Sequence, residues 1–321
     1  MSIATEISRL QTAKADIKTA IEGKGVTVPS STTLSGYATL IDSIQTGGGS
    51  TGYTVEEIAN RYPSGDVTIS GQVAKCGMAY RLVTSISLPD ATSIPNRFCI
   101  GADNLASINA PNVTSIDEYA FSGCTSLESF DGENVVDLYS GSKNYIFNGC
   151  TNLASVSFPK LTGIYQYVFQ NCTSLKTVHL PNLTRLNTYN FKGSGVETIV
   201  LPKYNNLVSA WQVFNGATKL KTIDIYGASS VPQQYCAGCT VLNTLILRRT
   251  TVPTLQNINA FQNTPFASGN AGGTLYVPND LISSYQSASN WSTILGYSTN
   301  QILPIEGSIY ETQYADGTPI E

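Results

Sequence analysis

The chain has 321 residues, of which 41% are hydrophobic and 12% charged, and its formal net charge at pH 7 is −4. A chain of this length can bury a large core, but it has no cluster of basic residues that could neutralise a run of phosphates, so nucleic acid is not an expected partner. No window approaches the roughly eighteen consecutive apolar residues of a membrane-spanning helix, so membrane insertion is not expected either.

The first predicted element is a helix over residues 3–23. Its apolar residues recur at alternating spacings of four and three, which makes a heptad seam that one lysine interrupts. The seam consists of Ile3, Ile7, Leu10, Lys14, Ile17 and Ile21. A second short helix over 34–44 follows, and a helical pair of this size cannot bury enough surface to be stable alone. We therefore expect residues 1–46 to form a homo-oligomer, for which a trimer is permitted, or to dock onto another protein.

A Gly-rich segment, residues 47–52, is predicted to be a flexible linker. The region after it, residues 53–273, consists of internal repeats whose first apolar residues lie 21 to 26 positions apart. These residues are Ile86, Ile108, Phe130, Val156, Val178, Ile199, Ile223 and Leu245, with an earlier degenerate copy at Val67. A period of this length indicates a solenoid, in which neighbouring coils complete one another's core. We predict a mainly β fold of about eight or nine coils with a parallel sheet.

Each coil is predicted to begin with a short strand, because Ile86 and Leu88 alternate with Ser85 and Ser87. A proline such as Pro89 then ends the strand, since proline has no N–H for the ladder. The next leg turns a second apolar residue into the core, at Ile94, Ile116, Ile164 and Leu186. A phenylalanine column fills the widest part of the coils and consists of Phe98, Phe121, Phe147, Phe169, Phe191 and Phe214.

A cysteine follows the phenylalanine in several coils, as in FSGCTSLESF, FNGCTNLASV and FQNCTSLKTV. The column reads Cys124, Cys150, Cys172, Ser194, Ala217 and Cys239. Because serine and alanine replace cysteine, the position requires a small buried side chain, and a packing role is predicted rather than a redox or metal role. Cys236 and Cys239 have CxxC spacing, but the repeat places Cys236 in the phenylalanine column. The first residues show no secretion pattern, so the seven cysteines are expected to be reduced.

Residues 274–321 are predicted to be a C-terminal cap. Leu275–Pro278 is expected to be the last strand, and an amphipathic stretch with Leu281, Ile282, Tyr285, Ala288 and Trp291 follows it. Repeat proteins require an atypical terminal unit of this kind to cover the open end of the core.

Neither catalysis nor a cofactor or metal site is predicted. The single histidine, His179, lies on a predicted strand and should face outward, and no nucleophile elbow accompanies it. One histidine and core-packed cysteines leave zinc without ligands, and no phosphate-binding or dinucleotide motif is present. The carboxylates are scattered, so an enzyme that acts on glycans requires two of them to meet in space near the tyrosines described next.

Two surfaces remain as candidate ligand-binding sites. Two positions before the phenylalanine column the coils have Asn96, four tyrosines, Gln212 and Gln234. The candidate aromatic column is Tyr119, Tyr145, Tyr167 and Tyr189, with Trp211 one position further back in the next coil. Coils about 4.8 Å apart would align these rings, which then either bind the apolar faces of sugars or only stack on one another. The strand face carries small polar groups that either bind a glycan or meet water, and its candidates are Asn109, Asp131, His179 and Asp224.

The repeat, approximately L-P-x-x-T-x-I-x-x-x-x-F-x-G-C-x-x-L, resembles the BspA-like leucine-rich repeat family over residues of about 67–260. The resemblance implies a curved solenoid with a parallel sheet and a binding role, often adhesion to host or cell surfaces. The sequence departs from the pattern where Gly132 and Glu133 replace Leu-Pro, where Ser194 and Ala217 replace Cys, and in the longer coil between 130 and 156. We expect these departures to disturb strands locally and to leave the fold intact.

The N-terminal segment resembles the short helical module at the start of many bacteriophage tail and fibre-type proteins. The expected function is therefore that of a non-catalytic virion structural protein of the tail-fibre or head-decoration type, assembled in the host cytoplasm. Its helices would attach to one another or to another virion protein, and its repeats would bind a cell-surface or mucosal glycan or protein. The alternatives are a bacterial surface adhesin, located on the cell surface, and an enzyme that acts on glycans.

Overall fold

The structure is a computed structural model. It describes residues 14–19, 22, 64–69, 82–138, 140–141, 143–205, 210–227, 229–297 and 299–320. Most of the predicted N-terminal module lies outside these residues, including Ile3, Ile7, Leu10, Ile21, the helix over 34–44 and the linker over 47–52. The described residues belong to two compact units that divide between residues 63 and 64.

In the first unit, residues 14–19 are helical, as predicted for the part of the seam that they cover. The Thr19 hydroxyl donates to the Ala15 carbonyl at 3.0 Å, and Lys18 pairs with Glu22 one turn later at 3.7 Å. Lys14 and Ile17, three positions apart, are both half-buried. The oligomerisation assigned to this seam stays a prediction, and so do the segment boundaries at 46, 52 and 273.

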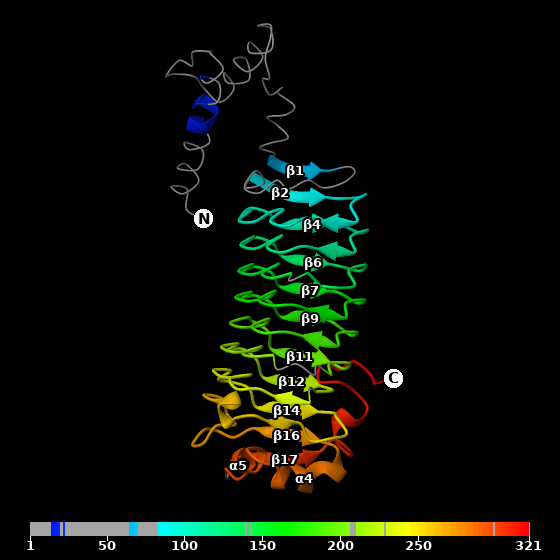
Figure 1. Ribbon diagram of the computed structural model, residues 1–321, viewed down its shortest axis with the longest axis vertical. Helices are drawn as coiled ribbons and strands as arrows, with labels where there is room; N and C mark the ends of the chain where they lie inside the picture. Colours follow the sequence, from blue (N-terminus) through cyan, green and yellow to red (C-terminus); the bar gives the residue numbers. More distant parts are fainter. Residues whose placement is uncertain are drawn as a thin grey trace. The chain divides into compact units, whose positions relative to one another are not determined.

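The second unit is the predicted β solenoid (Figure 1). Its longer strands form three hydrogen-bonded blocks, within which every pairing is parallel. The blocks are β1 (Ser64–Thr68), β2 (Leu82–Ser87) and β4 (Ser107–Asn109); β6 (Ser129–Asp131), β7 (Ser155–Ser157) and β9 (Thr177–His179); and β11 (Thr198–Leu201), β12 (Thr222–Ile225), β14 (Thr244–Leu247), β16 (Thr274–Val277) and β17 (Gln301–Pro304). The predicted register is confirmed, because Ile86 pairs with Ile108 and Val67 with Ile86.

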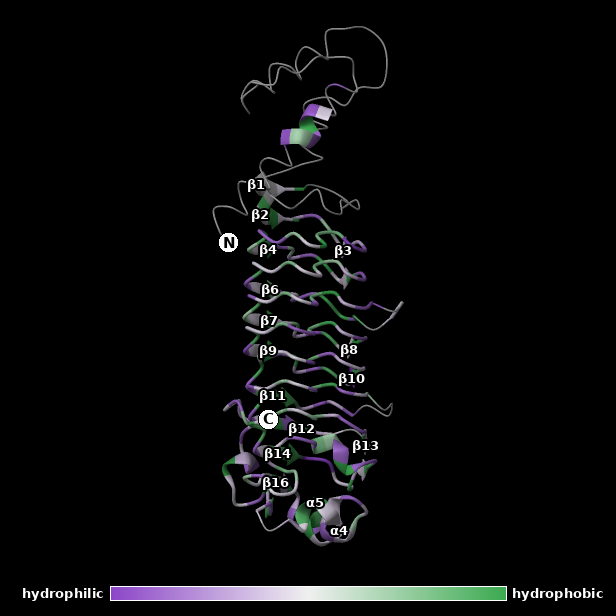
Figure 2. Cartoon of the chain, turned by 90° about the vertical axis from the view of Figure 1, so that its left-hand side faces the viewer, coloured by the Kyte–Doolittle hydropathy of each residue, from purple (hydrophilic) through white to green (hydrophobic). Residues whose placement is uncertain are grey.

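Two-residue strands line the opposite side of the coils (Figure 2). They pair as β3 (Ser93–Ile94) with β5 (Ser115–Ile116), β8 (Gly163–Ile164) with β10 (Arg185–Leu186), and β13 (Ser230–Val231) with β15 (Thr254–Leu255). The apolar residue of each of these strands is buried, as predicted for the second leg of the coil. Their hydrogen bonds hold the coils together on the side away from the longer strands.

The phenylalanine column fills the core between the two sides. Phe121, Phe147, Phe169, Phe191 and Phe214 are fully buried and stack with ring centroids 5.4–5.7 Å apart. Burial of each side chain of this size contributes about 1.5–3 kcal/mol, so the column adds to the cohesion between coils.

The first member of the column was predicted one residue too early. The Cys99 amide donates to the Ala120 carbonyl at 2.7 Å, as the Phe121 amide donates to the Ile146 carbonyl at 2.9 Å. Cys99 therefore occupies the phenylalanine position, and Phe98 packs edge-on against the ring of Phe121 at 6.4 Å. Consequently Arg97, and not Asn96, aligns with the tyrosines.

The buried cysteine column has the predicted packing role. Each thiol donates to a backbone carbonyl of the preceding coil, as Cys150 does to Phe121 and Cys172 to Phe147, both at 3.1 Å. Burial raises the pKa of the Cys124 thiol to about 12, despite a hydrogen bond that lowers it. Cys236 occupies the phenylalanine position, and its amide donates to Ala260 at 2.8 Å. The thiols are thus held neutral and away from solvent.

The sheet is interrupted where the sequence departs from the repeat. No ladder joins β4 to β6 or β9 to β11 among the described strands. In the first interrupted coil, a Cβ on Gly132 would lie 2.3 Å from the Phe158 ring, so only glycine leaves room for that larger residue of the next coil. In the second, the coil is one residue shorter, and a Cβ on Gly195 would lie 2.1 Å from the Thr173 carbonyl oxygen. The expected local disturbance of strands is confirmed beside Gly132 and Ser194. It does not occur at the longer coil or at Ala217, because β6 pairs fully with β7 and β11 pairs fully with β12.

The C-terminal end is capped by helices, but Leu275–Pro278 is not the last strand. The sheet gains β17, whose Ile302 pairs with Leu275, after the chain has formed α4 (Ile282–Ser287) and α5 (Trp291–Leu295). Short 3-10 helices also occur, at Ile258–Phe261, Asn279–Leu281 and Ile309–Glu311. Trp291 is buried, and its indole N–H donates to the Pro253 carbonyl at 2.7 Å. In the described part of the chain, no helix is long and apolar enough to cross a membrane.

Candidate functional site

The open part of the strand face extends from β2 to β9. Asn109, Asp131 and His179 are exposed there, as predicted, each at the end of its strand. Asp131 and His179 are in register, because Ser157 pairs with both of them. Asn109 belongs to the neighbouring block, and the bond from the Glu128 amide to the Ala106 carbonyl at 3.0 Å brings its strand alongside that of Asp131. A parallel row of serine and threonine, Ser85, Ser107, Ser129, Ser155 and Thr177, accompanies them. This surface offers mostly neutral hydrogen-bonding groups at every coil.

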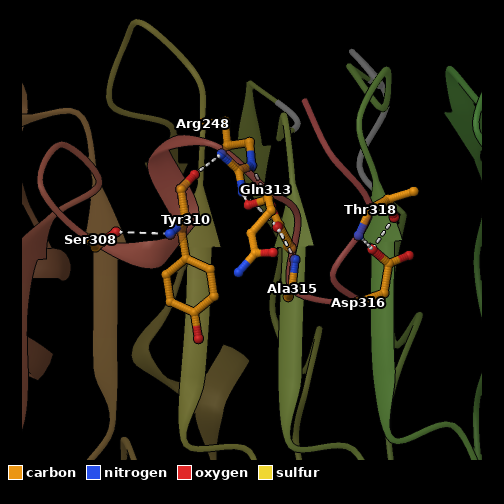
Figure 3. A network of polar contacts seen from close by, with 8 residues as sticks. Arg248, Ser308, Tyr310, Gln313, Ala315, Asp316 and Thr318 are labelled. Carbon is orange, nitrogen blue, oxygen red and sulfur yellow. Dashed lines mark hydrogen bonds and ion pairs between the residues drawn. The ribbon is translucent and has the colours of Figure 1, made fainter. Parts of the chain in front are cut away.

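The fourth candidate of this face, Asp224, is not accessible. It is fully buried, and its carboxylate accepts from Arg248 Nε at 2.6 Å, from Arg248 Nη2 at 2.8 Å and from the Ala315 amide at 2.8 Å. The cause is residues 307–320, which follow β17 and lie across the strand face (Figure 3). We call these residues the C-terminal strap. Burial raises the pKa of Asp224, and the hydrogen bonds from Arg248 act in the opposite direction.

The tyrosine column is a stacked ladder. Consecutive rings of Tyr119, Tyr145, Tyr167 and Tyr189 lie 4.9, 4.4 and 4.7 Å apart, with interplanar angles of 7°, 6° and 11°. Cations lie over the two end rings, with Arg97 5.1 Å from Tyr119 and Lys192 5.1 Å from Tyr189. Because the ring faces contact one another, the ladder presents ring edges and hydroxyls to a ligand. Burial, together with neighbouring Glu118 and Tyr145, raises the pKa of Tyr119.

These tyrosines adopt a backbone conformation that sequence analysis did not anticipate. All four have positive φ, between 56° and 64°, and so do Arg97, Gln212 and Gln234 at the same position of other coils. Such a conformation costs a non-glycine residue on the order of 1 kcal/mol. Hydrogen bonds between coils compensate, as from the Tyr119 amide to the Asn144 carbonyl at 3.0 Å. The constant position, two residues before phenylalanine, was the only signal in the sequence.

Trp211 does not continue the ladder. Gln212 occupies the ladder position in that coil, and its side-chain Nε2 donates to the side-chain Oε1 of Gln234 at 2.5 Å. Trp211 lies one position earlier and is 55% exposed. Its indole is therefore an aromatic surface separate from the tyrosine stack.

The potential metal-ligating side chains of the described residues do not gather into one site. No group of three or more His, Cys, Asp or Glu in the described part of the chain could hold a metal ion. Glu118, a carboxylate beside the ladder, accepts from Asn96 and from Asn144, both at 3.3 Å. The pair of carboxylates that glycan hydrolysis requires is not formed by these contacts.

Comparisons with known proteins identify the repeats. Six copies of the BspA type leucine-rich repeat region match residues 92–207 and 140–268. Similar solved structures include a leucine-rich repeat protein from Bacteroides ovatus, with 18% identity, 75% of this chain and 88% of that chain covered, and a TM-score of 0.29. The pneumococcal vaccine antigen PcpA has 14% identity, 74% and 67% coverage and a TM-score of 0.40. A leucine-rich repeat protein from Eubacterium ventriosum has 15% identity, 75% and 78% coverage and a TM-score of 0.33.

The comparison with curated proteins gives no match. The family match covers residues 92–268, more than half of the 321 residues, and coincides with the coils described above. The chain therefore belongs to the BspA-type leucine-rich repeat family.

Proposed function

We propose that the protein is a non-catalytic binding protein that presents the open part of its strand face to a cell-surface or mucosal ligand. The observation that carries this proposal is the aligned row of exposed Asn109, Asp131 and His179 beside the serine and threonine row. Neutral hydroxyl and amide groups repeated at a fixed spacing suit the hydroxyl groups of a glycan chain, and they favour a glycan over a charged partner. The tyrosine ladder, with its ring faces occupied, is the second candidate surface.

Binding of the full chain to fixed bacterial cells and to mucin tests the proposal. Replacement of Asn109, Asp131 and His179 together by alanine should weaken binding at least about ten-fold, since each removes a hydrogen-bonding group worth about 1 kcal/mol. Tyr145→Phe with Tyr167→Phe, which removes two ladder hydroxyls, is the matched control and should leave binding unchanged. The reverse pattern would assign the ligand to the ladder. Loss of binding after glycosidase treatment of the surface, but not after protease treatment, would identify a glycan.

We further propose that the protein is a virion structural component, anchored through its N-terminal helices. The heptad seam supports this proposal, and Lys14 and Ile17 lie on one side of its described turn. The full chain should be an oligomer in solution, and Ile17→Lys should reduce its mass to that of a monomer, whereas the exposed Ala15→Lys should not. A monomeric natural chain would mean that the helices dock onto a different protein.

The rival setting is the bacterial cell surface. Recovery of the protein from purified cell envelopes, and not from virions, would favour an adhesin. An enzyme that acts on glycans is the remaining alternative, and release of new reducing ends from cell-wall polysaccharide would reveal it.

A further inference from the structure

The C-terminal strap touches the strand face without becoming part of the sheet. Near its start, the strap forms a short 3-10 helix, Ile309–Glu311. Residues 312–320 then form a small hairpin, in which the Tyr314 amide donates to Thr318 at 2.8 Å and the Ile320 amide to Thr312 at 3.1 Å. None of the residues 307–320 is fully buried. The strap is thus a locally folded segment that lies on the surface.

One latch holds the strap on the sheet. Arg248 donates through Nη1 to the Tyr310 carbonyl at 2.7 Å and through Nη2 to the Gln313 carbonyl at 3.1 Å (Figure 3). Asp224 accepts from the Ala315 amide at 2.8 Å. In the described part of the chain, all hydrogen bonds between strap and sheet involve these two side chains. Bonds to main-chain groups recognise the backbone conformation of the strap, a 3-10 turn followed by a hairpin, and not a particular side chain.

Aromatic contacts supply the selectivity of the latch. The Tyr310 ring meets the Tyr276 ring edge-on at 4.8 Å, and the Arg248 guanidinium lies 4.9 Å from the centre of the Tyr314 ring. Tyr310 and Tyr314 are four positions apart in the chain. The surface therefore accepts a segment with the strap's conformation that carries two aromatic residues at this spacing.

The attachment of the strap to the sheet is expected to be weak. It buries the Asp224 and Arg248 pair, and removal of a charged pair from water costs energy that offsets part of the attraction. A segment of which no residue is fully buried, and whose hydrogen bonds to the sheet involve only two side chains in the described structure, is expected to open before the sheet does. When it opens, Asp224, Arg248 and Tyr276 lose their contacts with the strap and become available to another segment.

We propose that the strap is the resident occupant of a peptide-binding site on β12, β14 and β16, and that a segment of a partner protein that folds as the strap does, with two aromatic residues four positions apart, takes its place. The inference goes beyond the proposed function, since it concerns the covered part of the strand face and a peptide partner.

The test uses the full chain with a weakened strap, Tyr310→Ser with Tyr314→Ser, and a fluorescent peptide of the natural sequence 307–320. The peptide should bind this variant at least about ten-fold more tightly than the natural chain, whose own strap competes. The same peptide with both tyrosines replaced by serine should not bind. When Arg248→Lys is introduced into the weakened-strap variant, binding of the natural peptide should be abolished, because lysine lacks the guanidinium fork. Arg249→Lys is the matched control, since Arg249 bonds to Gly227 and Thr251 and not to the strap.

Three results would overturn the proposal. The first is absence of peptide binding when hydrogen exchange at the Ala315 amide shows that the weakened strap has left. The second is a strap that stays closed in the variant, because the tyrosines would then not be recognition elements. The third is a doubled mass of the natural chain through exchanged straps, which would assign the site to a second copy. Peptide binding without any cell-surface binding would remove the proposed function and leave this site in place.

Discussion

Two neighbouring residues, Ser194 and Gly195, mark the point where the repeat is least regular, and the structure gives them opposite roles. Ser194 occupies the cysteine column, but its hydroxyl is buried without a hydrogen-bond partner in the described structure. Gly195 donates its amide to the Cys172 carbonyl at 3.0 Å, and its missing Cβ leaves room for the Thr173 carbonyl. The first residue is therefore replaceable and the second is not.

We expect Gly195→Ala to lower the free energy of unfolding by about 2–3 kcal/mol, because its Cβ would collide with backbone that cannot move without displacing a coil. Ser194→Cys should raise it by about 1 kcal/mol, since a thiol at this position can bond to the preceding coil as its column neighbours do. Urea denaturation of both variants measures these values, with Ser194→Ala as the neutral control. An equal effect of Gly195→Ala and Ser194→Ala would contradict the steric argument.

At the scale of elements, the features that recur in every coil could be predicted from the sequence, and the features that occur once could not. The repeat period predicted the strands, the second leg and the phenylalanine column, because the same residue types recur at the same positions in successive coils. Phe98 was wrongly assigned to the phenylalanine column because it precedes Cys99, the residue that occupies the column position, and both side chains are buried in the same core. Residue type alone cannot distinguish two adjacent buried positions.

The strap and β17 were missed for a different reason. They lie after the last recognisable coil, where no periodic pattern indicates which surface a segment covers. Asp224 was predicted to be exposed because the alternation within β12 is that of an ordinary strand, and its burial depends on residues about ninety positions later. The tyrosine column was predicted with two alternatives, sugar binding or stacking of the rings on one another. The structure shows that the rings stack, because their distances and angles are those of face-to-face contact.

At the scale of the whole solenoid, the two interruptions of the sheet are unequal. Across the first, the Glu128 amide still donates to the Ala106 carbonyl at 3.0 Å. Across the second, no hydrogen bond in the described structure joins the residues that flank β9 and β11, and the Gly195 amide bonds to the Cys172 carbonyl only three residues before β11. The C-terminal block of five strands is also the longest, and the cap closes its end. Because repeat proteins gain stability from contacts between nearest neighbours, the weakest interface divides the array into units that open separately.

Native-state hydrogen exchange should therefore reveal two cooperative units that divide near residue 197. Amides of β12, β14 and β16 should share the highest protection, and those of β6, β7 and β9 should exchange at a lower common free energy. The first interruption, which keeps its hydrogen bond, should produce no separate unit and serves as the internal control. Ser194→Cys should raise protection on both sides of the second interruption, because it strengthens the coil next to it. A single protection level from β2 to β17 would mean that the phenylalanine column and the two-residue strands couple all coils, and the sheet interruptions would then have no thermodynamic consequence.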